Sequence, residues 1–210
     1  MEKPAKVTRN PERTARQILE AATIEFSEKG LSGARVDTIA ERANINKRML
    51  YHYYGNKEGL FIAVMEQAYS EIRSHERELN LEHIPPMEAA RKLAQYTFDY
   101  FIEHPEFIRL LNSENLFGAR HIKKSTRIRD MHSPLIEQID KVLKRGVADG
   151  VFRDDVDPVH FYITVASLGY FYLSNAATLS EIFGRDLRTK AALDARREHI
   201  ESVVTGFLRP

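Results

Sequence analysis

Apolar residues recur at intervals of three and four along most of the chain, a spacing that predicts amphipathic helices. The first run predicts a helix over residues 11–29, with Asn10 as its cap, Pro11 in its first turn and Gly30 at its end. Its inward positions are Ala15, Ile18, Leu19, Ala22 and Phe26. This segment is therefore expected to bury one face of a long helix.

Two shorter helices are predicted next, over residues 36–43 and 47–54, with a sharp break between them. In the break, Asn44 suits a left-handed backbone angle and Asn46 suits the cap of the following helix. Asn56 can cap a fourth, longer helix. The buried stripe of that helix comprises Phe61, Val64, Met65, Ala68 and Ile72.

The carboxyl-terminal part of the chain continues the helical pattern. The polar run over residues 73–83 and the pair Pro85-Pro86 indicate a seam between two domains. Helices are then predicted over residues 86–103 and 105–117, from Ser133-Pro134 to Gly150, over 158–183 after the Asp157-Pro158 entrance, and over 188–207. Because no alternating strand pattern occurs, we expect an all-α protein with domains at residues 1–55 and 85–210, joined by a connecting helix at 56–84.

Composition excludes several classes of protein. A content of 43% apolar and 29% charged residues is typical of a folded globular chain, and the lack of cysteine excludes disulfides and thiolate metal sites. Without a signal peptide or a membrane-length apolar run, we expect a cytoplasmic, nucleoid-associated protein with no membrane partner. We find no glycine-rich phosphate loop and no His-Glu pair at metal-ligand spacing, and therefore expect no cofactor, no metal and no enzymatic activity.

Charge and rings concentrate in the short helix over 47–54. Four-residue spacing places Lys47 beside Tyr51 and Arg48 beside His52, with Leu50 on a different side. Residues 1–60 carry a net charge of +3, and the remainder carries −2. A helix, a sharp turn and a short helix with long donors outward can enter the major groove of DNA. The alternative is that the rings form core and the charges form a solvated face.

The run VDTIAERANINKRMLYHYYGNKEGLF, residues 36–61, resembles the DNA-binding signature of the TetR (tetracycline-repressor) family of bacterial regulators. The matching positions are Ile39-Ala40, Ala43, Leu50-Tyr51, Tyr53-Tyr54, Lys57-Glu58 and Leu60-Phe61. Two positions depart from the family pattern, because Asn44 stands where Gly is usual and Arg35 stands where a capping Thr or Ser is usual. The match covers residues 11–65, and the rest resembles the family in its helical architecture only.

The resemblance implies an amino-terminal helix-turn-helix at about residues 34–53, followed by a helical domain for ligand binding and dimerisation. It implies that Lys47 and Arg48 read bases or nearby phosphates, with His52 able to do either. The full set of predicted DNA contacts is Arg35, Val36, Asn46, Lys47, Arg48, Tyr51, His52, Tyr53 and Lys57.

The second domain is expected to hold an effector and to pair with a second copy. The predicted effector-site residues are Phe98, Phe101, Asn112, Asn115, Phe117, His121, Phe161 and Phe171, although these rings could also be plain core. The predicted homodimer interface comprises Leu168, Tyr172, Ile200, Val203, Val204 and Phe207, and its alternative is again internal core.

We therefore expect a regulator, in keeping with the family a repressor, that binds a palindromic double-stranded operator as a dimer. A small-molecule effector, aromatic or heterocyclic, would release it from DNA by favouring another conformation. The alternatives are a transcriptional activator, or a helical enzyme or scaffold that does not bind DNA.

Overall fold

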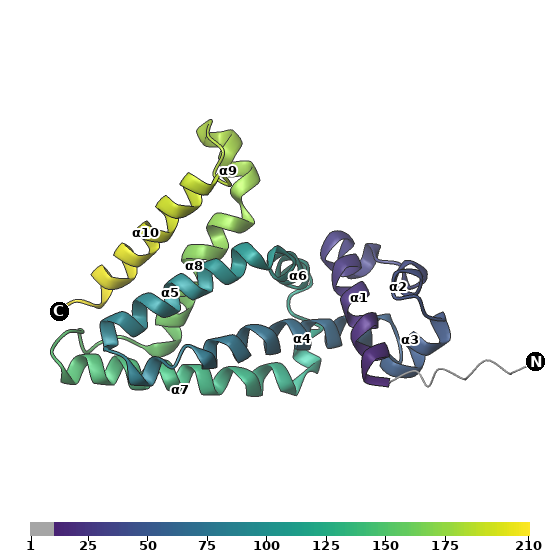
Figure 1. Cartoon of the computed structure of the whole chain (residues 1–210), viewed down its shortest axis with the longest axis horizontal. Coiled ribbons are helices and arrows are strands. Elements are labelled where there is room, and N and C mark those ends of the chain that lie inside the picture. The colour runs from purple at the N-terminus through teal and green to yellow at the C-terminus, as the bar shows by residue number, and fades with distance from the viewer. Residues whose placement is uncertain (1–10) are drawn as a thin grey trace, which may run out of the picture. The chain divides into compact units, whose positions relative to one another are not determined.

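The structure is a computed structural model that describes residues 11–210, and it contains helices and no strands over that range. Asn10, the predicted cap of the first helix, lies outside the described residues. Figure 1 shows the order of the helices along the chain. Their bounds are α1 Pro11–Gly33, α2 Val36–Arg42, α3 Lys47–Tyr54, α4 Lys57–Glu78, η1 Leu81–His83, α5 Pro86–Glu103, α6 Pro105–Leu116, η2 Ile122–Lys124, α7 Thr126–Ala148, α8 Pro158–Ser174, α9 Ala176–Phe183 and α10 Lys190–Leu208.

The helices pack into two compact units, each with its own core. The first, which we call the head unit, contains residues 11–67 and 109–125, and the second, the body unit, contains residues 68–108 and 126–210. The predicted domain limits at residues 55 and 84 were drawn along the chain and remain a prediction. By packing, residues 109–125, from the predicted second domain, group with the head unit.

The core of the head unit is built from the apolar stripes that the spacing predicts. Ile18 and Phe26 of α1, Leu50 of α3 and Phe61 of α4 have no exposed surface. The rings of Phe26 and Phe61 meet edge to face with their centroids 5.2 Å apart, a favoured aromatic arrangement. Regular helix in α1 stops at Gly30, whose φ of 64° is readily adopted by glycine, as predicted.

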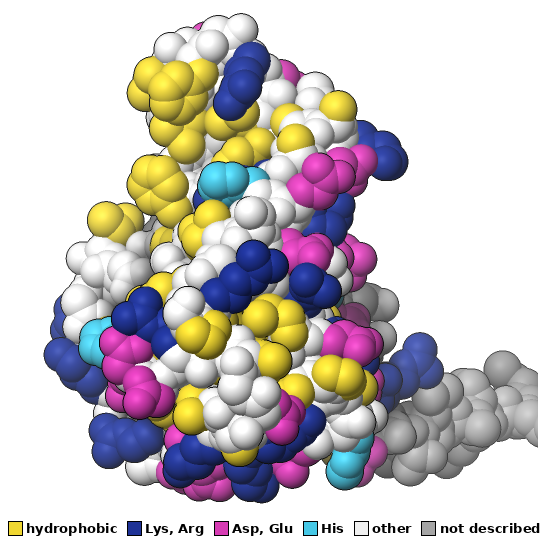
Figure 2. All heavy atoms as spheres, turned by 90° about the vertical axis from the view of Figure 1, so that its left-hand side faces the viewer, with side chains coloured by type: hydrophobic (Ala, Val, Ile, Leu, Met, Phe, Trp, Pro, Cys, Tyr) yellow, Lys and Arg dark blue, Asp and Glu magenta, His cyan; other side chains and the backbone are white. Residues whose placement is uncertain are grey.

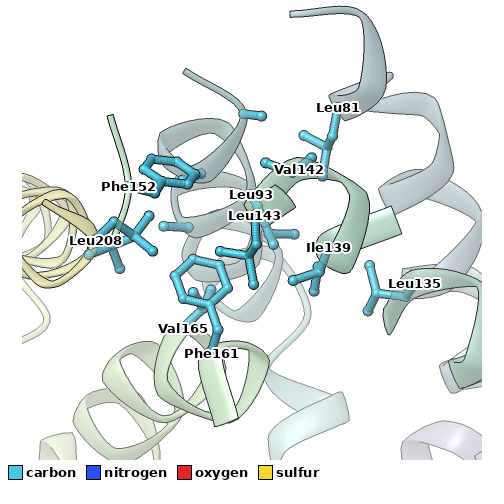
Figure 3. Close-up of a cluster of buried hydrophobic side chains, with 14 of the residues drawn as sticks. Leu81, Leu93, Leu135, Ile139, Val142, Leu143, Phe152, Phe161, Val165 and Leu208 are labelled. Carbon is cyan, nitrogen blue, oxygen red and sulfur yellow. The ribbon is translucent and has the colours of Figure 1, made fainter. Parts of the chain in front are cut away.

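The core of the body unit joins α5, α7, α8 and α10. Figure 3 shows its side chains converging from these helices and from the segment after α7. Its members include Leu93, Ile139, Phe161, Val165 and Leu208. A Cβ at Gly146 of α7 would collide with the ring of Phe152, so this close approach requires glycine.

Two predicted helix limits are wrong. The helix predicted to open at Ser133-Pro134 begins at Thr126 and carries Pro134 in its interior. Burial of Ile128 before the proline and of Leu135 after it gives the helix one continuous apolar stripe, which outweighs the hydrogen bond that proline cannot donate.

The helix predicted over 158–183 is also wrong, because it is broken at Asn175 into α8 and α9. The side-chain amide of Asn175 donates to the carbonyl of Phe171 at 2.8 Å, and such local bonds compete with helix propagation. The cap of α8 is as predicted, since Asp157 accepts from the backbone N–H of His160 at 2.8 Å.

The polar run over 73–83 is not a solvated seam throughout. Arg73 and Glu76, both within α4, are 2% and 1% exposed. Over residues 11–210, none of the helices combines the length and the apolar character that crossing a membrane requires.

Candidate nucleic-acid interface

The turn between α2 and α3 has the conformation that the sequence predicts. Asn44 adopts a left-handed angle, with φ of 51°, which Asn tolerates better than most residues. The side chain of Asn46 accepts a hydrogen bond from the backbone N–H of Arg48 at 2.9 Å and so caps α3. Asn56 likewise accepts from Gly59 at 2.8 Å at the start of α4.

The start of α2 is secured differently from the family pattern. Arg35 makes no capping bond with its side chain. Instead, the buried carboxylate of Glu25 on α1 accepts from the backbone N–H of Arg35 at 3.1 Å and from Lys29 at 2.9 Å. Burial would raise the pKa of Glu25, but these hydrogen bonds outweigh it and hold the pKa below its usual value. Sequence reasoning did not find Glu25, because its partner lies ten positions away.

One side of α3 is anchored and the other faces solvent. Leu50 is fully buried, whereas Lys47, Arg48, Tyr51 and His52 are exposed. With Leu50 fixing the rotation of the helix, two cations, a phenol and an imidazole are presented outward from eight residues. This arrangement is the one predicted for the segment, and it supplies donors suited to phosphates and base edges.

The remaining predicted DNA contacts are less exposed than these side chains of α3. Val36 is 9% exposed and belongs to the core at the start of α2. Tyr53 is half-buried, with its ring 5.7 Å from that of His52 and 6.2 Å from that of Tyr54. Lys57 is also half-buried and donates from Nζ to the carbonyl of Ser32 at 3.3 Å.

Lys47 is not free in this structure. Its ammonium group lies 2.7 Å from the carboxylate of Asp37 on α2, and both side chains are exposed. The hydrogen bond between them lowers the pKa of Asp37 and raises that of Lys47. Asp37 was not predicted, and it introduces a negative charge on the surface that is predicted to contact DNA phosphates.

The joint between α3 and α4 is tightly packed. The hydroxyl of Tyr54 donates to the carbonyl of Ala15 at 3.2 Å, which ties the end of α3 to α1. A Cβ at Gly59 would collide with the carbonyl oxygen of Tyr54. The end of α3 is therefore fixed from two directions.

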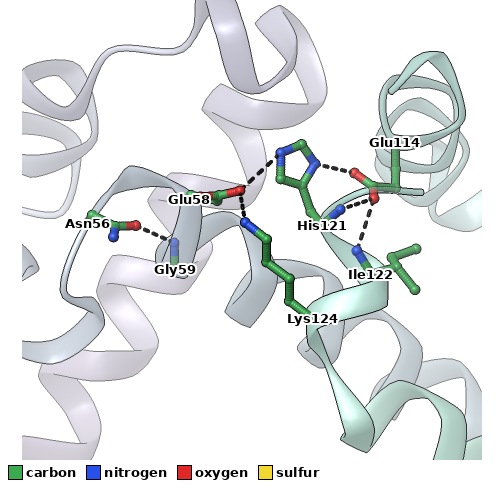
Figure 4. Close-up of polar contacts among 7 residues, drawn as sticks. All are labelled: Asn56, Glu58, Gly59, Glu114, His121, Ile122 and Lys124. Atoms are coloured by element: carbon green, nitrogen blue, oxygen red, sulfur yellow. Dashed lines mark hydrogen bonds and ion pairs between the residues drawn. The ribbon is translucent and has the colours of Figure 1, made fainter. Parts of the chain in front are cut away.

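A buried polar network in the head unit involves one predicted effector residue, His121. Figure 4 shows the imidazole between two carboxylates. Glu114 accepts from Nδ1 of His121 at 2.6 Å and from the backbone N–H groups of His121 and Ile122 at 2.8 and 3.0 Å. On the other side, Nε2 lies 3.5 Å from Glu58, which also binds Lys124 at 2.5 Å. His121 therefore already has protein partners at both ring nitrogens.

The other predicted effector residues fall in both units. In the head unit, Asn112 is half-buried, Asn115 is exposed, and Phe117 contacts His121 edge to face at 5.8 Å. In the body unit, Phe98 and Phe101 are buried against Gly169, Phe161 is buried in the core, and Phe171 is 59% exposed. A cavity of about 10 Å³ beside Phe161 has room for no more than a water molecule. The effector-site assignment remains a prediction.

The predicted dimer residues divide into buried and exposed sets. Ile200 and Val204 are 1% and 0% exposed inside the body core, so they have no surface left to bury against a second copy. Leu168, Tyr172 and Val203 are half-buried, and Phe207 is 41% exposed.

Apolar side chains are nevertheless exposed on the last helices. Figure 2 shows hydrophobic side chains gathered at the upper end of the face that it presents, the end at which α9 lies in Figure 1. The exposed members are Val159, Ile163 and Phe171 on α8, and Ile182 and Phe183 on α9. The spacing of 159, 163 and 171 puts the α8 members on one side of that helix. Large apolar side chains exposed on one side of a helix are candidates for an interaction site.

Within the described residues, no cluster of three or more His, Cys, Asp or Glu side chains could hold a metal ion.

Comparison with known proteins agrees with this geometry. Residues 18–64 match the family described as bacterial regulatory proteins, tetR family. Residues 86–204, more than half of the chain, match the tetracyclin repressor-like C-terminal domain.

Two relatives and two solved structures extend the comparison. The HTH-type transcriptional repressor NicS of Pseudomonas putida is 40% identical over 181 residues, 86% of this chain and 85% of NicS. The HTH-type transcriptional repressor SCO4008 of Streptomyces coelicolor is 32% identical over 142 residues, 66% of this chain and 69% of SCO4008.

Among solved structures, the match to the crystal structure of SCO4942 from Streptomyces coelicolor covers 94% of this chain and 99% of the SCO4942 chain, at 23% identity and a TM-score of 0.71. The match to the structure of KstR2 of Mycobacterium tuberculosis covers 99% of this chain and 100% of the KstR2 chain, at 20% identity and a TM-score of 0.68. These two structures share the fold.

Proposed function

This chain belongs to the TetR family of bacterial transcriptional regulators, and we propose that it represses transcription by binding a palindromic operator as a dimer. It is a DNA-binding regulator and not an enzyme. The relatives NicS and SCO4008, both named as repressors, support repression over activation.

The proposal for DNA contact rests on one observation, the outward presentation of donors by α3. Lys47, Arg48 and His52 are exposed around a buried Leu50. A helix of this kind can lie in the major groove with its amino-terminal residues toward the bases. We assign base contacts to Lys47, Arg48 and His52. Phosphate contacts are assigned to Tyr51, Tyr53 and Lys57, with further contributions from Arg35 and the start of α3 at Asn46.

The dimer proposal follows from the short reach of α3, which we call the reading helix. One such helix contacts too few base pairs for useful specificity, whereas two half-sites one helical turn or more apart double the contact. The exposed apolar side of α8 supports pairing through this helix and α10, where Phe207 is also exposed. Burial of that surface in a twofold interface would remove it from water.

An effector completes the proposed mechanism. A molecule that binds one conformation of the dimer better than another shifts the population toward it. If the favoured conformation holds the two reading helices at the wrong separation for the operator, DNA is released. Localisation in the cytoplasm follows from this role and is part of the proposal.

Selection from sheared genomic DNA tests the proposal directly. The purified protein should enrich short palindromes, and its affinity for them should fall steeply with salt because phosphate contacts release counterions. A triple variant Lys47→Ala, Arg48→Ala, His52→Ala should abolish the enrichment while keeping the thermal midpoint of the wild type. If the wild type recovers random sequences, and the triple variant recovers the same sequences to the same extent, the assignment of DNA contacts to α3 is refuted.

The mode of action needs a separate measurement. A reporter placed behind an enriched palindrome should be silenced when the protein is expressed, and the α3 triple variant should restore it. An increase in reporter output with the wild-type protein would instead identify an activator.

A further inference from the structure

Two charged side chains lie deep in the body unit. Arg73 and Glu76 of α4 are 2% and 1% exposed, although Arg and Glu are almost never fully buried unless paired. The hydroxyl of Tyr162 on α8 accepts from Nη2 of Arg73 at 2.8 Å, and the guanidinium lies 5.2 Å from the centre of the same ring. Tyr96 of α5 shares this environment. Burial raises the pKa of its hydroxyl, the charge of Glu76 also raises this pKa, and the charge of Arg73 lowers it. We call these four residues the α4 polar cluster.

The hydrogen-bonding capacity of the α4 polar cluster is largely unused. Nη1 of Arg73 lies 2.8 Å from Oε2 of Glu76, but without the alignment of a hydrogen bond. Nε and Nη1 of Arg73, both carboxylate oxygens of Glu76 and the hydroxyl of Tyr96 are all buried and have no hydrogen-bond partner. Native proteins seldom leave several such atoms together unsatisfied, and a group of them needs an explanation such as an ordered water or a bound ion.

We propose that the α4 polar cluster anchors the effector site and binds the carboxylate of a small aromatic acid. This inference rests on the proposed function. Unused donors at Arg73 and Tyr96 suit an anionic acceptor, and guanidinium is the group that best matches a carboxylate. An amine would bring a second positive charge next to Arg73.

Glu76 does not oppose an anionic ligand. Burial raises the pKa of Glu76 to about 7, although the charge of Arg73 acts in the other direction. Near neutral pH the carboxyl can therefore hold its proton and donate it to a ligand oxygen, which leaves one cation and one anion in the site.

The aromatic body of the ligand is inferred from the rings around the cluster. Tyr96 packs against Tyr100 with ring centres 5.9 Å apart. The ring of Tyr69, also on α4, lies with its centre 5.1 Å from that of His132. Burial lowers the pKa of this imidazole, and the positive charge of Arg73 lowers it further. A flat apolar body can stack among such rings, whereas a flexible polar chain cannot.

Calorimetry on the full-length protein without DNA tests the inference. The probes are benzoate, phenylacetate and ring-substituted benzoates, each compared with its primary amide. At least one acid should bind the wild type, and its amide should bind about tenfold more weakly or not at all, because the amide lacks the charge that pairs with guanidinium.

Removal of Arg73 alone would leave a buried carboxylate unpaired, so the decisive variant is Arg73→Met with Glu76→Met. Apolar replacement of a buried ion pair by residues of similar volume usually preserves folding. This double variant should keep the thermal midpoint and lose acid binding by about tenfold or more. Arg77→Gln, at an exposed position of the same helix, is the matched control and should bind as the wild type does.

The outcomes separate the two proposals. If no acid binds better than its amide, or if the double variant binds acids as well as the wild type, the cluster is a structural ion pair hydrated by water and the inference fails. Operator binding is measured separately by electrophoresis. A protein that binds operator and ignores every acid refutes only the inference, whereas one that binds acids and no DNA refutes the proposed function.

Discussion

The ammonium group of Lys47 on α3 lies 2.7 Å from the carboxylate of Asp37 on α2, so the first cation of the reading helix is partnered within the head unit. A DNA phosphate that approaches Lys47 must compete with this carboxylate and is also repelled by it. If α3 contacts DNA as proposed, the pair should limit binding to arbitrary duplex, because only a site with enough other contacts would displace Asp37.

Substitution Asp37→Asn should raise affinity for non-operator duplex by about two- to tenfold at low salt, and the gain should shrink as salt screens the charges. Specificity, measured as the ratio of operator to random duplex affinity, should fall. Glu41→Gln, which removes an exposed carboxylate later in the same helix, serves as the control. Weaker binding of Asp37→Asn to both duplexes would show that Asp37 positions Lys47 and does not restrain it.

The cap at Asn46 can be separated from any DNA contact. Asn46→Ala should lower the free energy of unfolding by about 1 kcal/mol, because the N–H of Arg48 loses its acceptor. Asn46→Asp keeps an acceptor and should keep stability, but it places a negative charge at the start of α3 and should weaken operator binding. Denaturant titration and electrophoresis measure the two effects. Wild-type affinity in Asn46→Asp would mean that this end of α3 does not face DNA.

The carboxylate of Glu114 should be essential to the head unit. In Glu114→Gln the amide oxygen can still accept from the two backbone N–H groups, but an NH2 group replaces the oxygen that bonds His121. The buried charge and its bond to the imidazole are lost, so the free energy of unfolding should fall by about 3 kcal/mol. Thermal and urea unfolding would measure the loss. Glu28→Gln, which changes an exposed carboxylate of α1, should alter stability by less than about 0.5 kcal/mol. Equal behaviour of the two variants would contradict the assigned role.

Stability should depend on pH through Glu76. Its folded-state pKa of about 7 lies above the ordinary value of 4.5, so the folded protein holds a proton that the unfolded chain has lost. This contribution to stability therefore falls as pH rises from about 4.5 to 7, by up to about 3 kcal/mol, and then levels off.

The comparison of wild type with Glu76→Gln isolates that contribution. Tyr96 and Tyr162 face the same site, and burial raises the pKa of both hydroxyls, so neither titrates in this range. Burial lowers the pKa of His132, which affects both proteins alike. Urea unfolding from pH 5 to 8 should show a steeper decline for the wild type. Parallel curves would mean that Glu76 is ionised throughout.

The exposed side of α8 should control the oligomeric state. Ile163→Asp with Phe171→Asp introduces two charges into the proposed interface and should convert a dimer to a monomer at micromolar concentration in analytical ultracentrifugation. Operator affinity should fall with it. The control is Arg129→Asp, an exposed position on α7. A wild type that sediments as a monomer at these concentrations would remove the proposal.

Much of the head unit could be predicted because its signals are local. The turn at Asn44 and the caps at Asn46 and Asn56 each involve residues within a few positions, and a 3.6-residue period identifies the buried side of each helix. The same local rules failed at Pro134 and Asn175, where packing and a side-chain bond to the backbone decided the outcome.

The polar interior could not be predicted. Glu25 meets Arg35 ten positions away, and Arg73 meets Tyr162 eighty-nine positions away. In the sequence, Arg73 and Glu76 belong to a charged run that is typical of a solvated face, and nothing in their spacing distinguishes a buried ion pair from an exposed one. Only tertiary packing shows which charged groups are enclosed.

The close approach at Gly59 determines how the reading helix could be exchanged between regulators. Since only glycine leaves space for the carbonyl of Tyr54, a graft that replaces α3 but introduces a bulkier residue at 59 would tilt the transplanted helix. The segment to transfer therefore runs through residue 59, past the last residue of α3. Chimaeras that are cut at Tyr54 and carry a bulkier residue at 59 should misread their new target.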